Sequence, residues 1–488
     1  MGDLKQRAAD LWPLGWGGLA LVAVIGCARP GSVPATRAPE VPLEVWVDAS
    51  ALAGGDGSQA TPWRELRPAL AAPAVVHLRS GLYEGPFTVG KGSRLVGHGV
   101  VVLFVEGPGV VLEATDARLE EVQVQGGDVG LVATGHVSLA AVTFSGQRQV
   151  AVSVRGQLDA ERLSLDGSIS GTVGLEVRPT ATATVRQSRA TGGFQKAVRS
   201  EGRLVVSAFD SKGPATAIHA TAGEVTLTGL TAEGGRGPGV FLAQTKASVQ
   251  DTTVRRHEYG ILTREAALTG SQLTVERTAR AALGLNGGTS SLDHLTVSAP
   301  GDLAGVQVLG GSATLSTVVI RGAVGTGVFS RAAELTLRTV DIDGVSKDVS
   351  GGKETNGDAV EVRGGKLNAT ALELTRAAGT GILATVGAVV ELDGIHCVEP
   401  GIACLLAERG ADVRAKAVRV DRPVQAAFAV PDEASLELEF PVVAPIPAMW
   451  LYAECSAGAQ VWLTLSPDEK LPERMSPCVR RLGKKHQH

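Results

Sequence analysis

The sequence predicts an all-β fold, a parallel β-helix (solenoid) of about 12–14 coils with a short N-terminal capping helix and a C-terminal cap. The first observation behind this prediction is a repeat, in which a small residue followed by an aliphatic or aromatic one recurs about every 22 residues. The second is that apolar and polar residues alternate inside each repeat. The repeated pairs are Gly130-Leu131, Ala151-Val152, Gly174-Leu175, Ala197-Val198, Ala217-Ile218, Gly239-Val240, Gly260-Ile261, Ala282-Leu283, Gly305-Val306, Gly327-Val328, Ala359-Val360, Gly381-Ile382, Gly401-Ile402 and Ala427-Phe428.

Three short alternations fill each repeat, as Val306/Val308 and Val318/Ile320 illustrate in residues 305–322. A period of two indicates strands with one face inward. The next coil, stacked at about 4.8 Å, would pair the backbone polar groups of the first and bury its inward aliphatic side chains. Gly or Ala leaves room where a larger side chain would clash. A leucine-rich repeat is excluded because no repeat has a 3.6-residue periodicity, and a β-sandwich because the period is fixed and superhelical.

Composition agrees with stacked strands. Of the 488 residues, 62 are Gly, only 4% are aromatic and 44% are hydrophobic, so the core must be built from Val, Leu, Ile and Ala. The net charge is −4, from 46 basic and 50 acidic residues, and neither sign forms a long run. A nucleic-acid partner is therefore not expected, because it would require a basic stripe.

The N-terminus has the pattern of an export signal. Lys5 and Arg7 precede an uncharged apolar stretch, residues 11–26, that is too short to span a membrane as a helix, so a cleaved signal peptide is expected over residues 1–26. The ending Val-Ile-Gly-Cys resembles the bacterial lipobox, which implies that Cys27 is lipidated. An ordinary signal with an incidental Cys is the alternative. Residues 27–42, rich in Pro, would then be a flexible tether.

The expected location is therefore the bacterial cell envelope, with a lipid anchor in the outer membrane on its periplasmic side or at the cell surface. Four cysteines remain, and an even number in an exported chain suggests disulfides. They permit three connectivities, of which the nearest-neighbour choice pairs Cys397 with Cys404 and Cys455 with Cys478. A zinc site is the rival interpretation, but no CxxC spacing supports it.

Residues 45–99 resemble the opening of secreted right-handed β-helix proteins of the pectin-lyase-like superfamily. The resemblance is carried by a strand ending in Asp, a Gly-Asp-Gly loop at 55–57, a Thr-Pro-Trp segment at 61–63 and Gly-Leu-Tyr-Glu-Gly at 81–85. It implies a right-handed helix with an N-terminal cap and first coil at 43–99, coils at 100–430 and a C-terminal cap at 431–488. Thr61 is expected to N-cap a helix starting at Pro62.

One step between repeats is 32 residues long, and its extra residues lie in an acidic segment, 341–362. Asp341, Asp343, Asp348 and Asp358 are candidate ligands for Ca²⁺, the one cofactor that the sequence suggests, because calcium prefers oxygen ligands. The alternative is a solvated loop whose acids are balanced by neighbouring Lys and Arg. By their alternation with Ile342, the first two should point to solvent.

A second candidate is the segment RRHEYG at 255–260. Arg255, His257, Glu258 and Tyr259 are catalytic candidates there, and surface decoration of one coil is the alternative. Gly-His-Gly at 97–99 is interpreted as a turn with an exposed His98. His486 and His488 form an HxH pair at the C-terminus, interpreted as a basic tail.

These observations favour a membrane-tethered, non-catalytic binding or structural module for an envelope polysaccharide or protein. The alternative is a polysaccharide lyase, hydrolase or epimerase acting on an acidic glycan. Residues 100–430 contain no Trp, which argues against a long saccharide groove rich in aromatic platforms.

Overall fold

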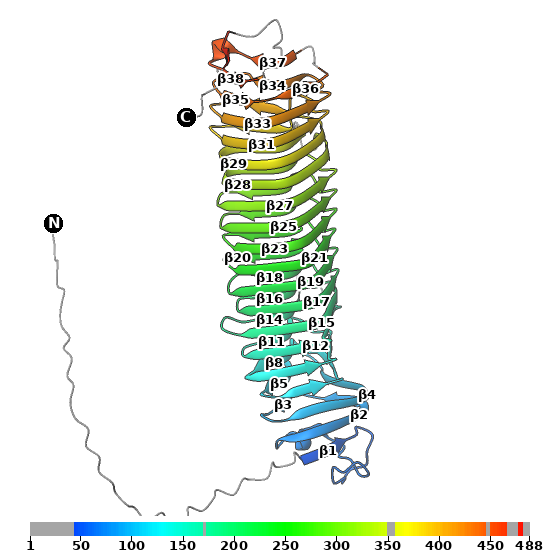
Figure 1. Ribbon diagram of the computed structural model, residues 1–488. Helices are drawn as coiled ribbons and strands as arrows, with labels where there is room; N and C mark the ends of the chain where they lie inside the picture. The colour runs from blue at the N-terminus through cyan, green and yellow to red at the C-terminus, as the bar shows by residue number, and fades with distance from the viewer. Residues whose placement is uncertain (1–42, 169–171, 349–356, 446–448, 466–476, 482–488) are drawn as a thin grey trace, which may run out of the picture. The chain divides into compact units, whose positions relative to one another are not determined.

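The computed structural model describes residues 43–168, 172–348, 357–445, 449–465 and 477–481, all within one compact unit. The strands in these ranges pair in parallel, coil upon coil, from β1 (Leu43–Val47) to β39 (Val479–Arg481) (Figure 1). Together they make a right-handed parallel β-helix of about 17 turns with almost no helix. The predicted fold class is confirmed. The coil number exceeds the expected 12–14, because residues 74–105 and 435–464 continue the same stack instead of forming separate caps.

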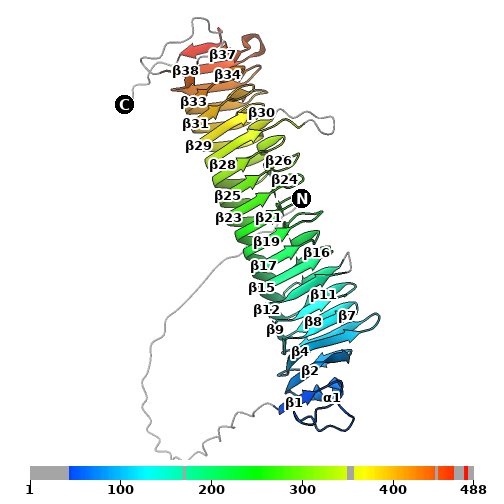
Figure 2. The same cartoon turned by 90° about the vertical axis from the view of Figure 1, so that its right-hand side faces the viewer.

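Each coil contributes to three sheets, and many strands bend from the first sheet into the second (Figure 2). Strands confined to the first sheet, besides β1 and β39, are β6 (Arg118–Glu120), β9 (His136–Ala140), β12 (Gln157–Glu161), β35 (Ser435–Glu439) and β38 (Gln460–Thr464). Those confined to the second are β7 (Gln123–Gly126), β10 (Thr143–Ser145), β13 (Ser164–Gly167) and β36 (Val442–Ala444).

Strands that run through both the first and the second sheet are β2 (Ala74–Glu84), β4 (Arg94–Val105), β15 (Thr182–Gly192), β17 (Arg203–Lys212), β19 (Glu224–Glu233), β21 (Lys246–Arg255), β23 (Ala267–Glu276), β25 (Thr289–Ser298), β27 (Ser312–Arg321), β31 (Val389–Val398) and β33 (Asp412–Asp421). The longest, β28 (Thr326–Val345) and β29 (Asp358–Ala377), pass through all three sheets.

The third sheet is built from short strands. They are β3 (Phe87–Val89), β5 (Val110–Thr115), β8 (Val129–Thr134), β11 (Val150–Val154), β14 (Val173–Val177), β16 (Lys196–Ser200), β18 (Thr216–Ala220), β20 (Val240–Ala243), β22 (Ile261–Arg264), β24 (Ala281–Asn286), β26 (Ala304–Leu309), β30 (Ile382–Thr385), β32 (Leu405–Ala407), β34 (Ala426–Val430) and β37 (Met449–Ala453).

A single residue in the left-handed conformation turns the chain from the first sheet into the second. His294, Thr317 and Thr339 occupy this position in three coils, with φ of 52°, 53° and 52°. The conformation costs a residue other than Gly roughly 1–2 kcal/mol. It recurs because each coil must bend at the same place to keep its register with the next. Gly229 and Gly394 occupy the same corner in two other coils, but His294, Thr317 and Thr339 give no such signal in the sequence.

The repeated pairs line the interior as expected. Val306, Val328 and Val360 lie directly above one another and are fully buried. The residue before each must be small, because a Cβ added to Gly305 would lie 2.6 Å from the carbonyl oxygen of Gly327 in the next coil. The Gly is therefore required by the close approach of stacked coils.

One repeated pair was assigned wrongly. Ile382 pairs with Leu405, and Leu405 with Phe428, so Cys404-Leu405 occupies the position that the sequence assigned to Gly401-Ile402. Ile402 instead lies in the turn before β32, where its N–H donates to the carbonyl of Gly379. The physical reason is that Cys404 is the small residue packed beneath the next coil.

The long step between repeats leaves the stack undisturbed. Val328 pairs with Val360 in the third sheet and Val340 with Leu372 in the second, although residues 349–356 intervene between β28 and β29. The additional chain is therefore confined to the turn between the second and third sheets.

The N-terminal helix differs from the expectation. The helix α1 covers Leu66–Ala69, and its N-cap, Glu65, makes no side-chain capping bond. Thr61 instead bonds to the carboxylate of Asp56 and to Ser58 in the preceding loop. Leu66 is still buried, and α1 packs against β1 and β2 of the first coils.

Both nearest-neighbour disulfides are present, Cys397–Cys404 within the coils and Cys455–Cys478 near the C-terminus, which confirms the predicted connectivity. The signal peptide at 1–26, Cys27 and the tether at 27–42 lie outside the described residues. Within the described ranges no helix has the length and apolar character needed to cross a membrane.

Candidate functional site

The outward face of the third sheet gathers aromatic and charged side chains. Among the described residues between 130 and 430, Phe144, Phe194, Phe209 and Phe428 are buried in the core. The remaining aromatic side chains are half-buried, and all three belong to this face. We call the set the third-sheet strip, and it consists of Arg199, His219, Phe241, Tyr259, Arg280, Phe329, Glu361 and Arg363.

Stacking of coils builds this strip. Arg199, His219 and Phe241 occupy one outward position in three successive coils, and Phe329 and Glu361 occupy the same position further along. Tyr259 lies in the turn before β22 and covers Gly284, where a Cβ would lie 3.6 Å from its ring. Residues separated by more than twenty positions thus become neighbours.

Each aromatic ring of the strip contacts a basic side chain. The imidazole of His219 stacks on Phe241, the Arg280 guanidinium lies 5.4 Å from the Tyr259 ring centre, and Arg363 lies 5.5 Å from that of Phe329. Burial, followed by the charges of Lys196 and Arg199, lowers the pKa of His219 to about 4. The imidazole is therefore neutral near pH 7, whereas the two guanidinium groups keep their charge.

Two carboxyl groups on β29 are buried. Asp358, 3% exposed, accepts hydrogen bonds from the backbone N–H of Thr380 at 2.7 Å and from its hydroxyl at 2.6 Å. Glu361, 6% exposed, accepts from the guanidinium of Arg363. Burial raises the pKa of both carboxyl groups, and these bonds only partly oppose it.

A third acid, Glu408, lies two coils further along. It accepts a hydrogen bond of 3.0 Å from the hydroxyl of Thr385, and its charge contributes to raising the pKa of both Asp358 and Glu361. Arg363 is the cation that opposes these charges. Carboxyl groups with raised pKa values beside an Arg are a common feature of acid-base sites.

The four aspartates predicted to bind Ca²⁺ are not gathered into one group. Asp341 and Asp343 lie on the outward face of the second sheet, where Arg321 and Arg376 each bind one of them through two hydrogen bonds. Their outward direction agrees with the prediction from Ile342, which is fully buried.

Asp358 belongs to the third sheet, and Asp348 follows the end of β28. The described ranges contain no group of three or more His, Cys, Asp or Glu side chains that could hold a metal ion. A calcium site at these aspartates stays a prediction.

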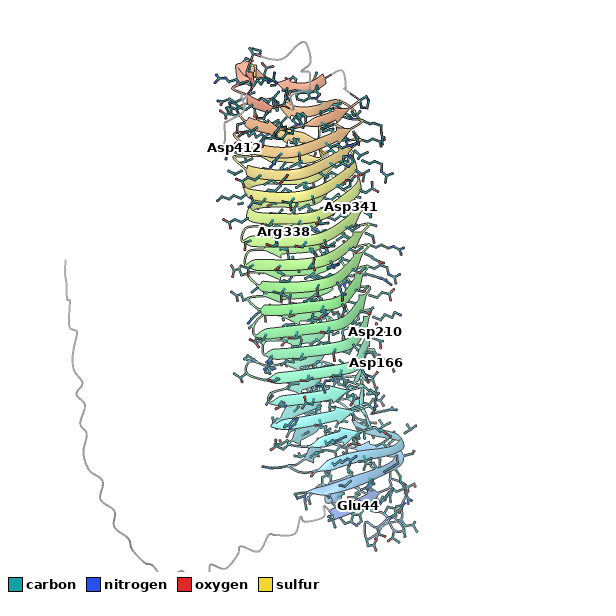
Figure 3. All side chains as sticks on the ribbon, viewed as in Figure 1. Glu44, Asp166, Asp210, Arg338, Asp341 and Asp412 are labelled. Carbon is teal, nitrogen blue, oxygen red and sulfur yellow. A yellow bond between two sulfur atoms is a disulfide. The ribbon has the colours of Figure 1, made fainter. Side chains whose placement is uncertain are left out.

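Charged side chains are also exposed on the second sheet, and some of them pair between coils. Figure 3 shows Asp166, Asp210 and Asp341 along this side of the stack. Lys212 pairs with Glu233 one coil further along at 3.6 Å. Such exposed pairs contribute roughly 0.2–1 kcal/mol each to stability.

The catalytic candidates in RRHEYG point in different directions. Arg255 pairs with Glu276 of the next coil at 3.0 Å, on the second sheet. His257 is only 2% exposed and contacts the Gly237 carbonyl at 3.2 Å, while burial lowers the pKa of its imidazole. Glu258 pairs with Arg280 at 3.6 Å. Of the four candidates, Tyr259 belongs to the third-sheet strip. A catalytic role for the four residues stays a prediction.

The first sheet carries a shallow hollow of a different kind. It spans about 440 Å³ over β19 to β27 and is lined largely by Ser and Thr, including Thr226, Ser248, Thr269, Ser291 and Thr314. These five outward side chains stand one above another in successive coils. Small hydroxyl side chains therefore make up much of the lining, and Glu224 and Lys246 also contribute to it.

Sequence reasoning identified Asp358 and Tyr259 but missed the residues around them. Phe329, Thr380 and Glu408 come from other coils, and nothing in their local sequence indicates a site. Writing successive repeats in register would have placed Phe329 next to Glu361, since both follow the ladder residue of their coil.

No protein-family model and no curated protein matches this chain. Solved structures with a similar fold include the pectate lyase Pel9A, at 15% identity over 60% of this chain and 76% of that one, with a TM-score of 0.29. A mannuronic acid specific polysaccharide family 6 lyase from human gut microbiota is 10% identical in sequence. The match covers 85% of this chain and 87% of that one, with a TM-score of 0.33. The A-module of the Azotobacter vinelandii mannuronan C-5 epimerase AlgE6 is 13% identical in sequence. The match covers 84% of this chain and 94% of that one, with a TM-score of 0.21.

Likeness of this degree concerns the fold alone and says nothing about activity. Three parallel sheets and one inward ladder per coil make this chain, in architecture, a right-handed parallel β-helix.

Proposed function

We propose that this chain is an exported lipoprotein, anchored in the bacterial cell envelope through Cys27, whose β-helix binds an envelope polysaccharide along the third-sheet strip. The observation that carries this proposal is the gathering of Phe241, Tyr259 and Phe329 on one outward face, each against a basic side chain. Ring faces complement the C–H surface of sugars, and guanidinium groups bind carboxylate or hydroxyl oxygens.

The spacing of the strip suits a polymer. Phe241 and Phe329 stand four coils apart, which is about 19 Å at the strand spacing of a sheet. A chain of several sugars would be needed to contact both rings, whereas a single sugar would contact one. The lipid anchor would keep the strip within reach of envelope material.

Binding of the purified chain to immobilised envelope polysaccharides tests the proposal. Phe329→Ala and Phe241→Ala should each weaken binding about 5- to 30-fold, since a stacked aromatic ring contributes on the order of 1–2 kcal/mol. Thr269→Ala, on the first sheet, is the matched control and should bind as the parent does. Equal binding by all four proteins, or none by the parent, would refute the proposal.

A second candidate function is catalysis on an acidic glycan, by lyase, hydrolase or epimerase chemistry. The specific observation in its favour is the pair of buried carboxyl groups, Asp358 and Glu361, with raised pKa values beside Arg363. A carboxyl group that keeps its proton at higher pH can act as a general acid.

Incubation with uronate polymers, with and without Ca²⁺, would separate the two functions. New absorbance from unsaturated ends indicates a lyase, new reducing ends without that absorbance a hydrolase, and altered uronate stereochemistry in an intact polymer an epimerase. Glu361→Gln should abolish any such activity. If the parent binds a polymer and leaves it unchanged, the catalytic candidate is wrong and the binding function stands.

A further inference from the structure

Two histidines on the first three coils lie edge to edge at the surface. His77 on β2 and His98 on β4 both point outward from the first sheet, and the Nδ1 of the former lies 2.9 Å from the Nε2 of the latter. The sequence indicated a turn at 97–99, whereas His98 lies within β4, exposed as predicted. Its pairing across coils, 21 positions from His77, emerges only from the fold.

An indole holds both rings in place. Trp46 on β1 stacks on His77 with centroids 4.5 Å apart and on His98 at 5.1 Å, each at an interplanar angle of 18°. Arg79 lies over the same indole at 5.8 Å and is itself tied to the carbonyl of Gln59 at 2.7 Å. The two imidazoles are therefore held next to one another, with the Nδ1 of His77 within hydrogen-bonding distance of the Nε2 of His98.

We propose that His77 and His98 form a binding site for a divalent first-row transition-metal ion. Two imidazole nitrogens at about 2.0–2.1 Å from a metal, at a right angle to one another, are about 2.9 Å apart. The observed separation therefore suits two neighbouring ligands of one ion as well as the N–H···N hydrogen bond of the metal-free protein. On binding, the metal takes one lone pair from each ring, and the imidazole that had donated the hydrogen bond carries its single proton on its other ring nitrogen, so both ligands stay neutral.

The surroundings leave coordination positions open. His98 is exposed, so water or a ligand from solution can complete the coordination shell. Imidazole ligands bind Cu²⁺ more tightly than Ni²⁺ or Zn²⁺, whereas Ca²⁺ and Mg²⁺ prefer oxygen.

Metal titration of the full chain tests the site, with His486 and His488 replaced by Asn in every sample to remove the terminal imidazoles. Cu²⁺ should quench the fluorescence of Trp46 at one equivalent and show two nitrogen ligands by electron paramagnetic resonance, whereas Mg²⁺ should do neither. His98→Asn and His77→Asn should each weaken Cu²⁺ binding about tenfold or more, as loss of a metal-site residue typically does. The exposed His98 can be replaced without disturbing the core.

Two controls separate this site from incidental binding. His294→Asn removes an exposed histidine paired with Asp293 and should bind Cu²⁺ as the parent does. Trp46→Phe should abolish most of the quenching while calorimetry still detects the ion. Cu²⁺ affinity that is unchanged in both His77→Asn and His98→Asn, or that falls equally in His294→Asn, would overturn the proposal.

Discussion

The imidazole of His219 lies flat on the ring of Phe241, one coil further along, with centroids 4.7 Å apart. The two side chains occupy the same outward position of the third sheet. This contact buries part of an imidazole beside two basic residues, Lys196 and Arg199, and so penalises its protonated form.

His219 should therefore titrate near pH 4, whereas the ordinary value is 6.5. Because the folded state holds fewer protons on this group than the unfolded state between these values, stability should fall as the pH drops from 6.5 to about 4. Histidine chemical shifts followed by NMR give the pKa directly, and urea unfolding of the parent and of His219→Gln gives the pH-dependent difference. Titration of His219 near 6.5 would contradict the buried stack.

The contribution of Glu361 to folding stability should depend on pH in the opposite direction to that of His219. The pKa of Glu361 in the folded protein lies above the ordinary 4.5, so the folded state holds more protons and its contribution to stability falls as the pH rises above 4.5. Glu361→Gln keeps a hydrogen-bond acceptor for Arg363 and removes this titration. Between pH 4.5 and neutrality, urea unfolding should give this variant a larger free energy of unfolding than the parent. Glu224→Gln, which replaces an exposed carboxylate, is the control and should show no such gain.

Leu337 and Arg338 are neighbours on β28 with opposite directions. Leu337 is fully buried in the interior ladder, and Arg338 is exposed (Figure 3). Leu337→Ala should cost about 2–5 kcal/mol in the free energy of unfolding, because it opens a cavity between stacked coils. Arg338→Ala should stay within about 0.5 kcal/mol of the parent. Similar losses in both variants would mean that the inward ladder does not carry the stability.

The lipid anchor is tested by Cys27→Ser. The variant should appear in the soluble fraction of cells, whereas the parent should sediment with membranes and partition into detergent, because one thiol carries the acyl chains. Ser32→Ala, in the same segment, is a control for changes to the tether. Membrane attachment of Cys27→Ser would show that Cys27 is not the lipidated residue.

Much of the fold was predictable because it repeats. Each coil must fill the same interior space, so a small residue followed by an aliphatic one recurs once per turn. The position of Val306 therefore predicts that of Val328 in the next coil. The prediction failed at Ile402, because Gly401-Ile402 has the right composition at nearly the right spacing. A bridged cysteine serving as the small residue could not be recognised from composition alone.

The candidate site was much less predictable. Asp358 was noticed for its charge, but its raised pKa depends on burial and on Glu408, fifty positions later in the sequence. The contact of Arg363 with Phe329 likewise depends on which coil lies next to which. The local sequence does not show which outward side chains meet. Inward positions are regular because each must fill the core, whereas outward positions face solvent and are not restricted in this way.

The unbroken register on both sides of residues 349–356 has a consequence for how such a chain can change. Insertions at the corner between β28 and β29 leave every neighbouring hydrogen-bond ladder intact, so the cost of a longer segment is mainly the slowly growing entropy of loop closure. This corner is accordingly where homologous chains would be free to differ in length, and where a foreign peptide could be grafted with least harm to the rest of the stack.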